Sequence, residues 1–170
     1  MHRHPNGEAA LRALLAEAEL PQEAKIIDLG AGDGDAVRQL RALGYDAAGI
    51  DLAPGADVEY GDILSPPFAA GSFDAALSQC AFLLTGAPEL AFQNTYKLLK
   101  AGGRLLFSDI VPGGEAALRA AAQGFELAYI RDTTDEWRRY YIEALWRGEA
   151  EPPPCGAARC RYLEAVLIKP

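Results

Sequence analysis

The 170-residue chain is poor in positive charge and in long apolar runs. Sixteen Lys and Arg against 24 Asp and Glu give a net charge of −8. That balance argues against a general nucleic-acid or anionic-membrane binder, because both classes need a basic face. No apolar run approaches the roughly 18 residues of a membrane-spanning helix, and no signal peptide is visible at the N-terminus. We therefore expect neither nucleic-acid nor membrane partners.

Cysteine is also scarce. Cys80, Cys155 and Cys160 are too few and too scattered for a disulfide framework, so the expected compartment is the reducing cytoplasm. Cys155 and Cys160 are close enough to share a soft metal or metalloid. No His or further Cys lies near them in the sequence, and we predict no metal site.

Half of the residues are hydrophobic, and the length fits one domain over residues 1–170, at about 150 residues per domain. The hydrophobic pattern predicts strands at residues 24–29, 46–51, 58–63, 73–79, 103–111, 125–130 and 159–169, and helices at 8–19, 35–43, 88–100, 115–123 and 135–147. This alternation predicts an α/β fold, a mostly parallel, doubly wound sheet with helices on both faces.

Two connections depart from the regular alternation. Residues 52–57 contain Pro54 and Gly55 and are too few for a crossover helix, so the crossover after the second strand is predicted to be a loop. Residues 131–158 form an insertion before the last strand, on the expected substrate side. Its aromatic residues, including Trp137, predict a partial lid or a dimer face, which leaves a homodimer open. The first 21 residues are assigned to an N-terminal helical segment.

The first strand runs into the turn Gly30-Ala31-Gly32-Asp33-Gly34. Glycines in such a turn let main-chain N–H groups approach a ligand without obstruction by side chains. Seventeen residues after Gly34, Asp51 ends the second strand. A carboxylate at that place can accept hydrogen bonds from both hydroxyls of a ribose. The pattern predicts a nucleoside-containing cofactor.

Two cofactor classes suit this geometry. Dinucleotide binders place their third glycine three residues after the second, where this chain has Asp35. Asp33 and Asp35, beside Asp28, would repel a pyrophosphate. They suit a ligand that carries an ammonium and a sulfonium. We therefore favour S-adenosylmethionine over NAD.

Five segments, in order, resemble the motifs of the class I S-adenosylmethionine-dependent methyltransferases. They are residues 26–34, 49–52, 61–63, 71–74 and 98–105. Any one of these motifs is weak evidence for the family, but five in the right order and at the right spacing are strong evidence. The resemblance implies a Rossmann-like, three-layer α/β/α fold with seven strands, of which the last is antiparallel.

The resemblance also implies roles for individual residues. The methionine portion of the cofactor would be held by Gly30, Ala31 and Gly32, with Asp28 beneath them. Asp51 would bind the ribose, and Leu52 would lie against the adenine. Asp62 would accept a hydrogen bond from the adenine amino group while Ile63 packs on the ring. Ser78, Gln79 and Cys80, at the end of the fourth strand, would face the bound cofactor.

The expected reaction is direct displacement at the sulfonium methyl, with a small molecule as acceptor. No residue is an unmistakable base. Four side chains are candidates, namely His4, Tyr140, Tyr141 and Asp132. The sequence therefore does not decide whether the methylated atom is O, N, S or a metalloid. A non-catalytic S-adenosylmethionine-binding pseudoenzyme or partner subunit remains an alternative, and an NAD-dependent oxidoreductase is a less favoured one.

Overall fold

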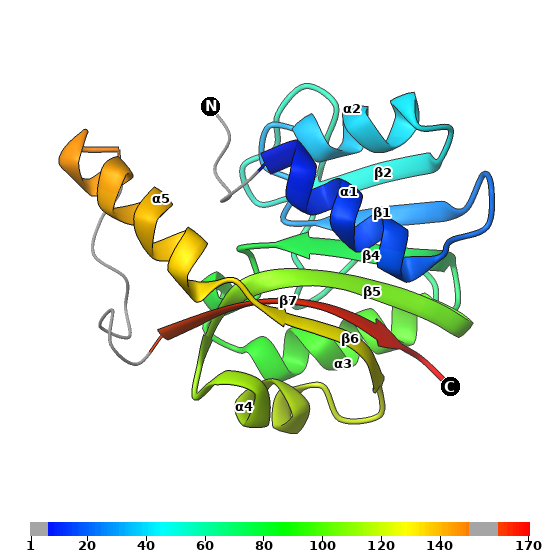
Figure 1. The fold of residues 1–170 in the computed structure, drawn as a ribbon. Coiled ribbons are helices and arrows are strands. Elements are labelled where there is room, and N and C mark those ends of the chain that lie inside the picture. The colour runs from blue at the N-terminus through cyan, green and yellow to red at the C-terminus, as the bar shows by residue number, and fades with distance from the viewer. Residues whose placement is uncertain (1–6, 150–159) are drawn as a thin grey trace.

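A computed structural model describes residues 7–149 and 160–170 of the chain. Its described strands form one seven-stranded sheet in the order β3-β2-β1-β4-β5-β7-β6 (Figure 1). The strands are β1 (Lys25–Leu29), β2 (Asp46–Asp51), β3 (Glu59–Tyr60), β4 (Phe73–Gln79), β5 (Leu99–Pro112), β6 (Glu126–Asp132) and β7 (Cys160–Ile168). The helices are α1 (Gly7–Ala18), α2 (Asp35–Ala42), α3 (Pro88–Leu98), α4 (Gly114–Ala121) and α5 (Thr134–Trp146), with a 3-10 turn, η1 (Leu83–Thr85).

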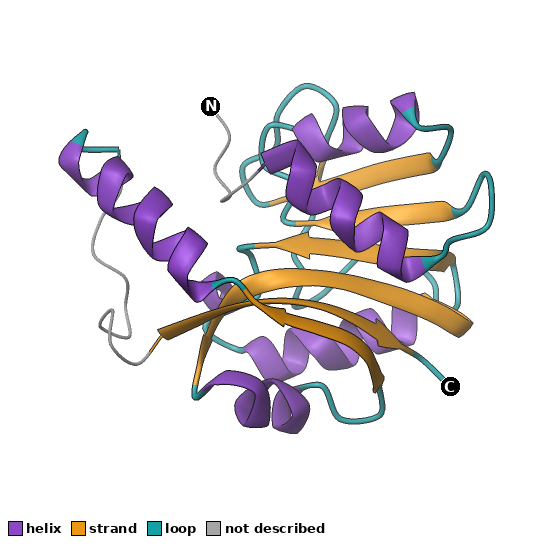
Figure 2. Cartoon of the chain, in the orientation of Figure 1, coloured by secondary structure: helices purple, strands orange, loops and turns teal. Residues whose placement is uncertain are grey.

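The sheet is covered by helices on both faces, as Figure 2 shows. On one face, Leu14 of α1 and Leu40 of α2 are fully buried in a cluster with Ile26 of β1. On the other face, Phe92 of α3 packs in a cluster with Ile27 of the same strand. Adjacent residues of β1 therefore supply both cores, because successive side chains of a strand point to opposite faces. The predicted three-layer α/β/α arrangement is confirmed.

The direction of the strands also agrees with the prediction. β3, β2, β1, β4 and β5 pair in parallel. β7 lies between β5 and β6 and is antiparallel to both. In this doubly wound arrangement the carboxyl ends of β1, β2, β4 and β5 lie at one edge of the sheet, where ligands bind in such folds.

Two strands differ from their predicted extents. β3 has only two residues, both exposed, although the pattern predicts residues 58–63. The chain leaves the sheet after Tyr60 because Asp62 Oδ1 accepts the N–H of Leu64 and makes a turn. β5 begins at Leu99 instead of Gly103, because Leu99 pairs with Phe73 before a register shift.

The loop predicted after β2 is confirmed, and it lies against the glycine turn. Gly55 N–H donates to the carbonyl of Gly32 over 2.8 Å. A Cβ on Gly55 would stand 2.8 Å from Asp33 Cα, so only glycine permits this approach. The shortened crossover thus positions the turn that follows β1.

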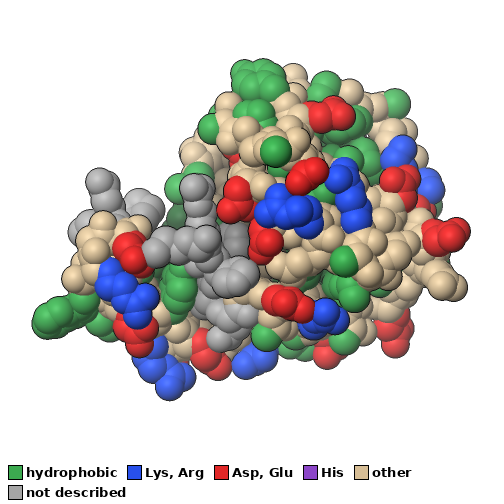
Figure 3. Space-filling model, turned by 90° about the horizontal axis from the view of Figure 1, so that it is seen from above, with side chains coloured by type: hydrophobic (Ala, Val, Ile, Leu, Met, Phe, Trp, Pro, Cys, Tyr) green, Lys and Arg blue, Asp and Glu red, His purple; other side chains and the backbone are tan. Residues whose placement is uncertain are grey.

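Helix α5 extends from the rest of the chain in Figure 1, and Figure 3 shows a matching projection at the left of the space-filling surface. Trp137 anchors it, since its ring is stacked on that of Tyr162 in β7 at 6.2 Å between centroids. Trp146, at the far end, is 87% exposed. These contacts agree with either a lid or a dimer face, and that choice stays a prediction. None of the helices within residues 7–149 and 160–170 has the length and apolar character to cross a membrane.

Candidate cofactor and acceptor site

A cavity of about 1100 Å³ opens at the carboxyl edge of the sheet. It brings together every predicted cofactor residue except Ser78. Those that line it are Asp28, Gly30, Ala31, Gly32, Asp51, Leu52, Asp62, Ile63, Gln79 and Cys80. Ser78 is fully buried within β4 and does not reach the cavity. The ends of β1, β2 and β4 therefore converge on one space, as the strand order requires.

The glycine turn is held by main-chain and carboxylate contacts. The N–H groups of Gly30 and Ala31 both donate to the carbonyl of Ile50, over 2.9 and 3.0 Å. Gly30 has a φ of +87°, which L side chains rarely adopt. A Cβ there would stand 2.4 Å from Ala81 Cβ. The turn therefore needs glycine both for its backbone conformation and for its contact with the segment after β4.

Gly30→Ala is expected to destabilise the protein by about 2–4 kcal/mol, through the left-handed backbone and the steric overlap together. Gly71→Ala is the matched control, because Gly71 has a φ of +66° and no atom lies within 4 Å of the place that a Cβ would occupy. It should lose only about 1–2 kcal/mol, the cost of the backbone conformation. Urea unfolding of both variants measures the difference, and equal losses would contradict the contact with Ala81.

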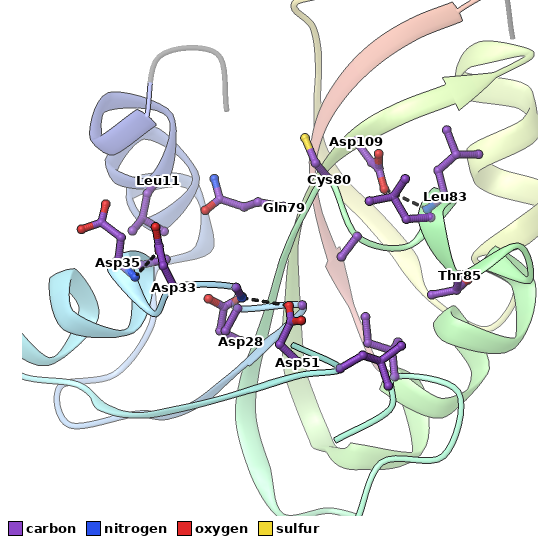
Figure 4. A pocket seen from close by; sticks show the side chains of 18 of the residues that line it. Leu11, Asp28, Asp33, Asp35, Asp51, Gln79, Cys80, Leu83, Thr85 and Asp109 are labelled. Atoms are coloured by element: carbon purple, nitrogen blue, oxygen red, sulfur yellow. Dashed lines mark hydrogen bonds between the residues drawn. The ribbon is translucent and has the colours of Figure 1, made fainter. Parts of the chain in front are cut away.

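Asp51 holds the turn from the neighbouring strand. Its Oδ2 accepts the N–H of Gly32 over 2.9 Å, and its Oδ1 accepts the N–H of Ala53 over 2.8 Å. The carboxylate is partly exposed and lines the cavity, where Figure 4 shows it beside the turn. Each oxygen keeps a further lone pair toward the cavity, which is what two ribose hydroxyls require.

Asp28 lies buried beneath the turn, 3% exposed. Burial, and then the negative charge of Asp51, raise its pKa to about 7. Ionisation of Asp28 is therefore energetically unfavourable unless a cation lies nearby. A ligand ammonium in the cavity would offset that cost, so the site is electrostatically suited to a cationic ligand.

Gln79 and Cys80 line the cavity at the end of β4. Gln79 Nε2 is buried and has no hydrogen-bond partner among the described residues, so it can donate to a ligand (Figure 4). Cys80 Sγ lies 3.2 Å from the hydroxyl oxygen of Tyr162. Burial, and then the charge of Asp109, raise the pKa of the Cys80 thiol to about 12. The thiol stays protonated near neutral pH and is a poor nucleophile.

The predicted adenine end is built from residues after β2 and β3. Leu52 is 61% exposed at the rim of the cavity, and Ile63 is buried within it. Asn94 of α3 donates to the carbonyl of Leu64 over 2.8 Å and fixes this segment. One oxygen of Asp62 is used by Leu64 N–H, and the other is left for a ligand amino group.

The other end of the cavity contains a carboxylate that sequence reasoning did not assign. Asp109 of β5 is 2% exposed and lines the cavity. Its Oδ2 accepts the N–H of Leu83 over 3.0 Å, and its Oδ1 accepts the N–H of Ile110 over 2.7 Å. Burial raises its pKa to about 6, against the opposing effect of these backbone hydrogen bonds. The sequence could have indicated Asp109, because it is an acidic residue near the end of the strand predicted at residues 103–111.

The candidate bases fall in different places. Tyr140 and Tyr141 of α5 line the cavity. Burial raises the pKa of Tyr140, so its hydroxyl holds its proton near neutral pH. Asp132 does not line the cavity and accepts hydrogen bonds from the backbone N–H and hydroxyl of Thr134. Partial burial raises its pKa, but these bonds and Arg161 bring it below the usual value. His4 lies outside the described residues.

The cysteine pair can be placed only in part. Cys160 is buried at the start of β7, in a cluster with Trp137 and Tyr162. Cys160 takes part in a disulfide bond, which the expectation from scarce and scattered cysteines did not include. Cys155 lies outside the described residues, and a metal role of the pair stays untested. Within residues 7–149 and 160–170, no three His, Cys, Asp or Glu side chains are grouped to hold a metal ion.

Comparison with known proteins agrees with this geometry. Residues 27–107 match the family described as "Methyltransferase domain". A malonyl-[acyl-carrier protein] O-methyltransferase of Erwinia billingiae is 30% identical over 138 residues, which are 72% of this chain and 55% of that protein. A demethylmenaquinone methyltransferase of Thermus thermophilus is 32% identical over 55% of this chain and 50% of its own length. The chain thus spans about half the length of the curated relatives it matches.

A solved structure extends the likeness of fold to nearly the whole chain. Phosphoethanolamine N-methyltransferase 2 of Haemonchus contortus, in complex with S-adenosyl-L-methionine, superposes with a TM-score of 0.76. The identity is 18%, and the match covers 98% of this chain and 54% of that one. The sequence match over residues 27–107 and this fold both agree with a class I S-adenosylmethionine-dependent methyltransferase.

Proposed function

We propose that the protein binds S-adenosylmethionine in the cavity and transfers its methyl group to a small-molecule acceptor. The adenine would lie between Leu52 and Ile63, the ribose on Asp51, and the methionine portion on the glycine turn. The Haemonchus neighbour in complex with S-adenosyl-L-methionine supports the choice of cofactor. The relatives' names give acceptors as different as a malonyl-acyl carrier protein and demethylmenaquinone, so they do not choose one for this chain.

The observation that carries this proposal is the carboxylate arrangement around the glycine turn. Asp51 binds the N–H of Gly32, and Asp28 is buried below with a raised pKa. Asp33 and Asp35 also line the cavity. Four carboxyl groups facing one space would repel a pyrophosphate and favour an ammonium and a sulfonium. The residues present therefore fit S-adenosylmethionine better than a dinucleotide.

The chemistry that the cofactor supplies is an activated methyl group, and the protein supplies alignment. The glycine turn and Asp51 would fix the cofactor from one side of the cavity. Trp137, Tyr140 and Tyr141 would confine the acceptor on the other, which keeps the two reactants in line. The thiol of Cys80 stays neutral and does not compete for the methyl group.

Transfer of a labelled methyl group tests the proposal. The protein is incubated with methyl-tritiated S-adenosylmethionine and a panel of small alcohols, amines, thiols and arsenite. Label in an organic product is expected with the intact protein and should fall about tenfold or more in Asp51→Ala, which loses cofactor affinity. Tight cofactor binding with no transfer to any acceptor would instead favour the pseudoenzyme.

A further inference from the structure

The end of the cavity away from the glycine turn has its own chemical character. The strand order places β5 on the far side of β4 from β1 and β2. Six residues at that end, here called the acceptor end, are Cys80, Asp109, Trp137, Tyr140, Tyr141 and Glu149. Figure 4 shows Cys80 and Asp109 apart from Asp28 and Asp51. A cofactor bound along the turn would leave this space for the acceptor.

The acceptor end is negatively charged. Asp109 and Glu149 contribute two carboxyl groups, and no Lys or Arg among the described residues lines this end. The one described cationic side chain that lines the cavity is Arg38, beside the glycine turn, where it donates to the Asp33 carbonyl and to Asp57. Arg147 acts electrostatically on Tyr140 but does not line the cavity. A carboxylate or phosphate on the acceptor would therefore meet like charge at the cavity wall.

The walls of the acceptor end are aromatic. Trp137 and Tyr141 lie with ring centroids 5.2 Å apart, and Trp137 stacks on Tyr162 behind it. Tyr140 lines the same space. Ring faces and edges of this kind hold an apolar body, and they attract a cation placed over them. The side chain of Gln79 is not part of this wall, since Figure 4 shows it directed toward Leu11 and Asp33 rather than Asp109.

Asp109 is fixed rather than mobile. Both of its oxygens accept backbone N–H groups, from Leu83 and Ile110, so the carboxyl group keeps one orientation beside the cavity. The N–H of Phe82 also hydrogen-bonds to this carboxylate, so one of its four lone pairs is left for a ligand. With a pKa raised to about 6, the group is largely a carboxylate at pH 7.5. It is therefore a preformed partner for a positively charged group.

We propose that the methyl acceptor is a small aryl- or alkylamine that carries no anionic group, held between the aromatic wall and Asp109. This inference rests on the proposed function. In the reaction the lone pair of the free amine forms the N–CH₃ bond, while the C–S bond breaks and its electron pair stays on sulfur. The positive charge moves from the sulfonium to the nitrogen, which becomes an alkylammonium and later releases a proton to solvent.

Asp109 would favour that step because positive charge builds up on the acceptor nitrogen in the transition state. The ammonium form held by Asp109 must first release a proton to solvent, and the free amine then forms the bond without a protein base. This agrees with the raised pKa values of Tyr140 and Cys80, which make both groups poor bases near neutral pH. An alcohol acceptor would instead need a base to remove its proton.

Matched ligand pairs test the inference. Protein loaded with S-adenosylhomocysteine is titrated by calorimetry with 2-phenylethylamine and tryptamine, and with the acids 3-phenylpropionate and indole-3-propionate. We expect the amines to bind about tenfold or more tightly than the matched acids, and to be methylated when S-adenosylmethionine replaces the product. Asp109→Asn keeps an oxygen for Leu83 N–H but removes the charge, and should reduce the amine preference about tenfold.

Glu126→Gln is the matched control, because it removes the same charge from an exposed position at the opposite end of the sheet. It should retain the amine preference. Equal or tighter binding of the acids, or an unchanged preference in Asp109→Asn with native unfolding behaviour, would overturn the inference. Affinity for S-adenosylhomocysteine is measured in every variant. If the unmodified protein does not bind S-adenosylhomocysteine, the proposed function itself is overturned. Failure of the amine inference alone would leave that binding intact, so the two failures are distinguishable.

Discussion

Asp51→Ala is expected to weaken the affinity for S-adenosylhomocysteine by about 1.5–3 kcal/mol, roughly 10- to 150-fold. The substitution removes the proposed acceptors for the two ribose hydroxyls. It also leaves the N–H groups of Gly32 and Ala53 without their carboxylate partner. Calorimetric titration of the variant and of the unmodified protein at the same pH measures the change.

Two further variants separate these contributions. Asp51→Asn keeps one oxygen that can accept from Gly32 but removes the charge and one acceptor, so its loss should be smaller. Asp46→Ala, on the exposed residue at the start of the same strand, should leave the affinity unchanged. Native affinity in Asp51→Ala would show that the ribose is bound elsewhere and would overturn the site assignment.

Asp28→Asn is expected to stabilise the cofactor-free protein increasingly as pH rises. The folded-state pKa of Asp28 is raised from 3.8 to about 7. Between those values the folded protein holds a proton that the unfolded chain has released, so stability falls with rising pH. Asparagine does not ionise and removes this dependence. From pH 5 to pH 8 the advantage of the variant should grow by about 2–3 kcal/mol.

Urea unfolding at the two pH values measures that growth, with Asp46→Asn as a control that removes a carboxyl group from an exposed position of β2. The same Asp28→Asn variant should bind S-adenosylmethionine about tenfold or more weakly, because the carboxylate that offsets the ligand ammonium is gone. Stability gained together with binding lost is the expected pattern for a functional group whose burial is unfavourable. An advantage that is equal at pH 5 and pH 8 would contradict the raised pKa.

Much of the fold could be predicted because the apolar pattern is unambiguous in the strands that carry it. Residues 73–79 form a strand with the predicted bounds, and residues 46–51 do as well. β3 was overpredicted, since the turn made by Asp62 ends the pairing after two residues. The start of β5 was placed too late because its pairing with Phe73 is a long-range contact that local pattern does not reveal.

That the proposed cofactor residues line one cavity could be predicted, because they follow strands in a fixed order. The turn after β1 and the acid at the end of β2 meet by topology alone. The acceptor half was harder. Ser78 and Gln79 are neighbours, yet only Gln79 lines the cavity. Asp109 was not predicted to line the cavity, because its orientation depends on the loop after β4, whose Leu83 N–H it binds.

Calorimetric titration of the unmodified protein with S-adenosylhomocysteine and, separately, with NAD addresses the central claim most directly. That claim is that a main-chain turn surrounded by carboxyl groups receives a cationic sulfonium cofactor rather than a pyrophosphate. We predict one-site binding of S-adenosylhomocysteine at micromolar strength and no binding of NAD. Binding of NAD with no binding of S-adenosylhomocysteine would contradict it.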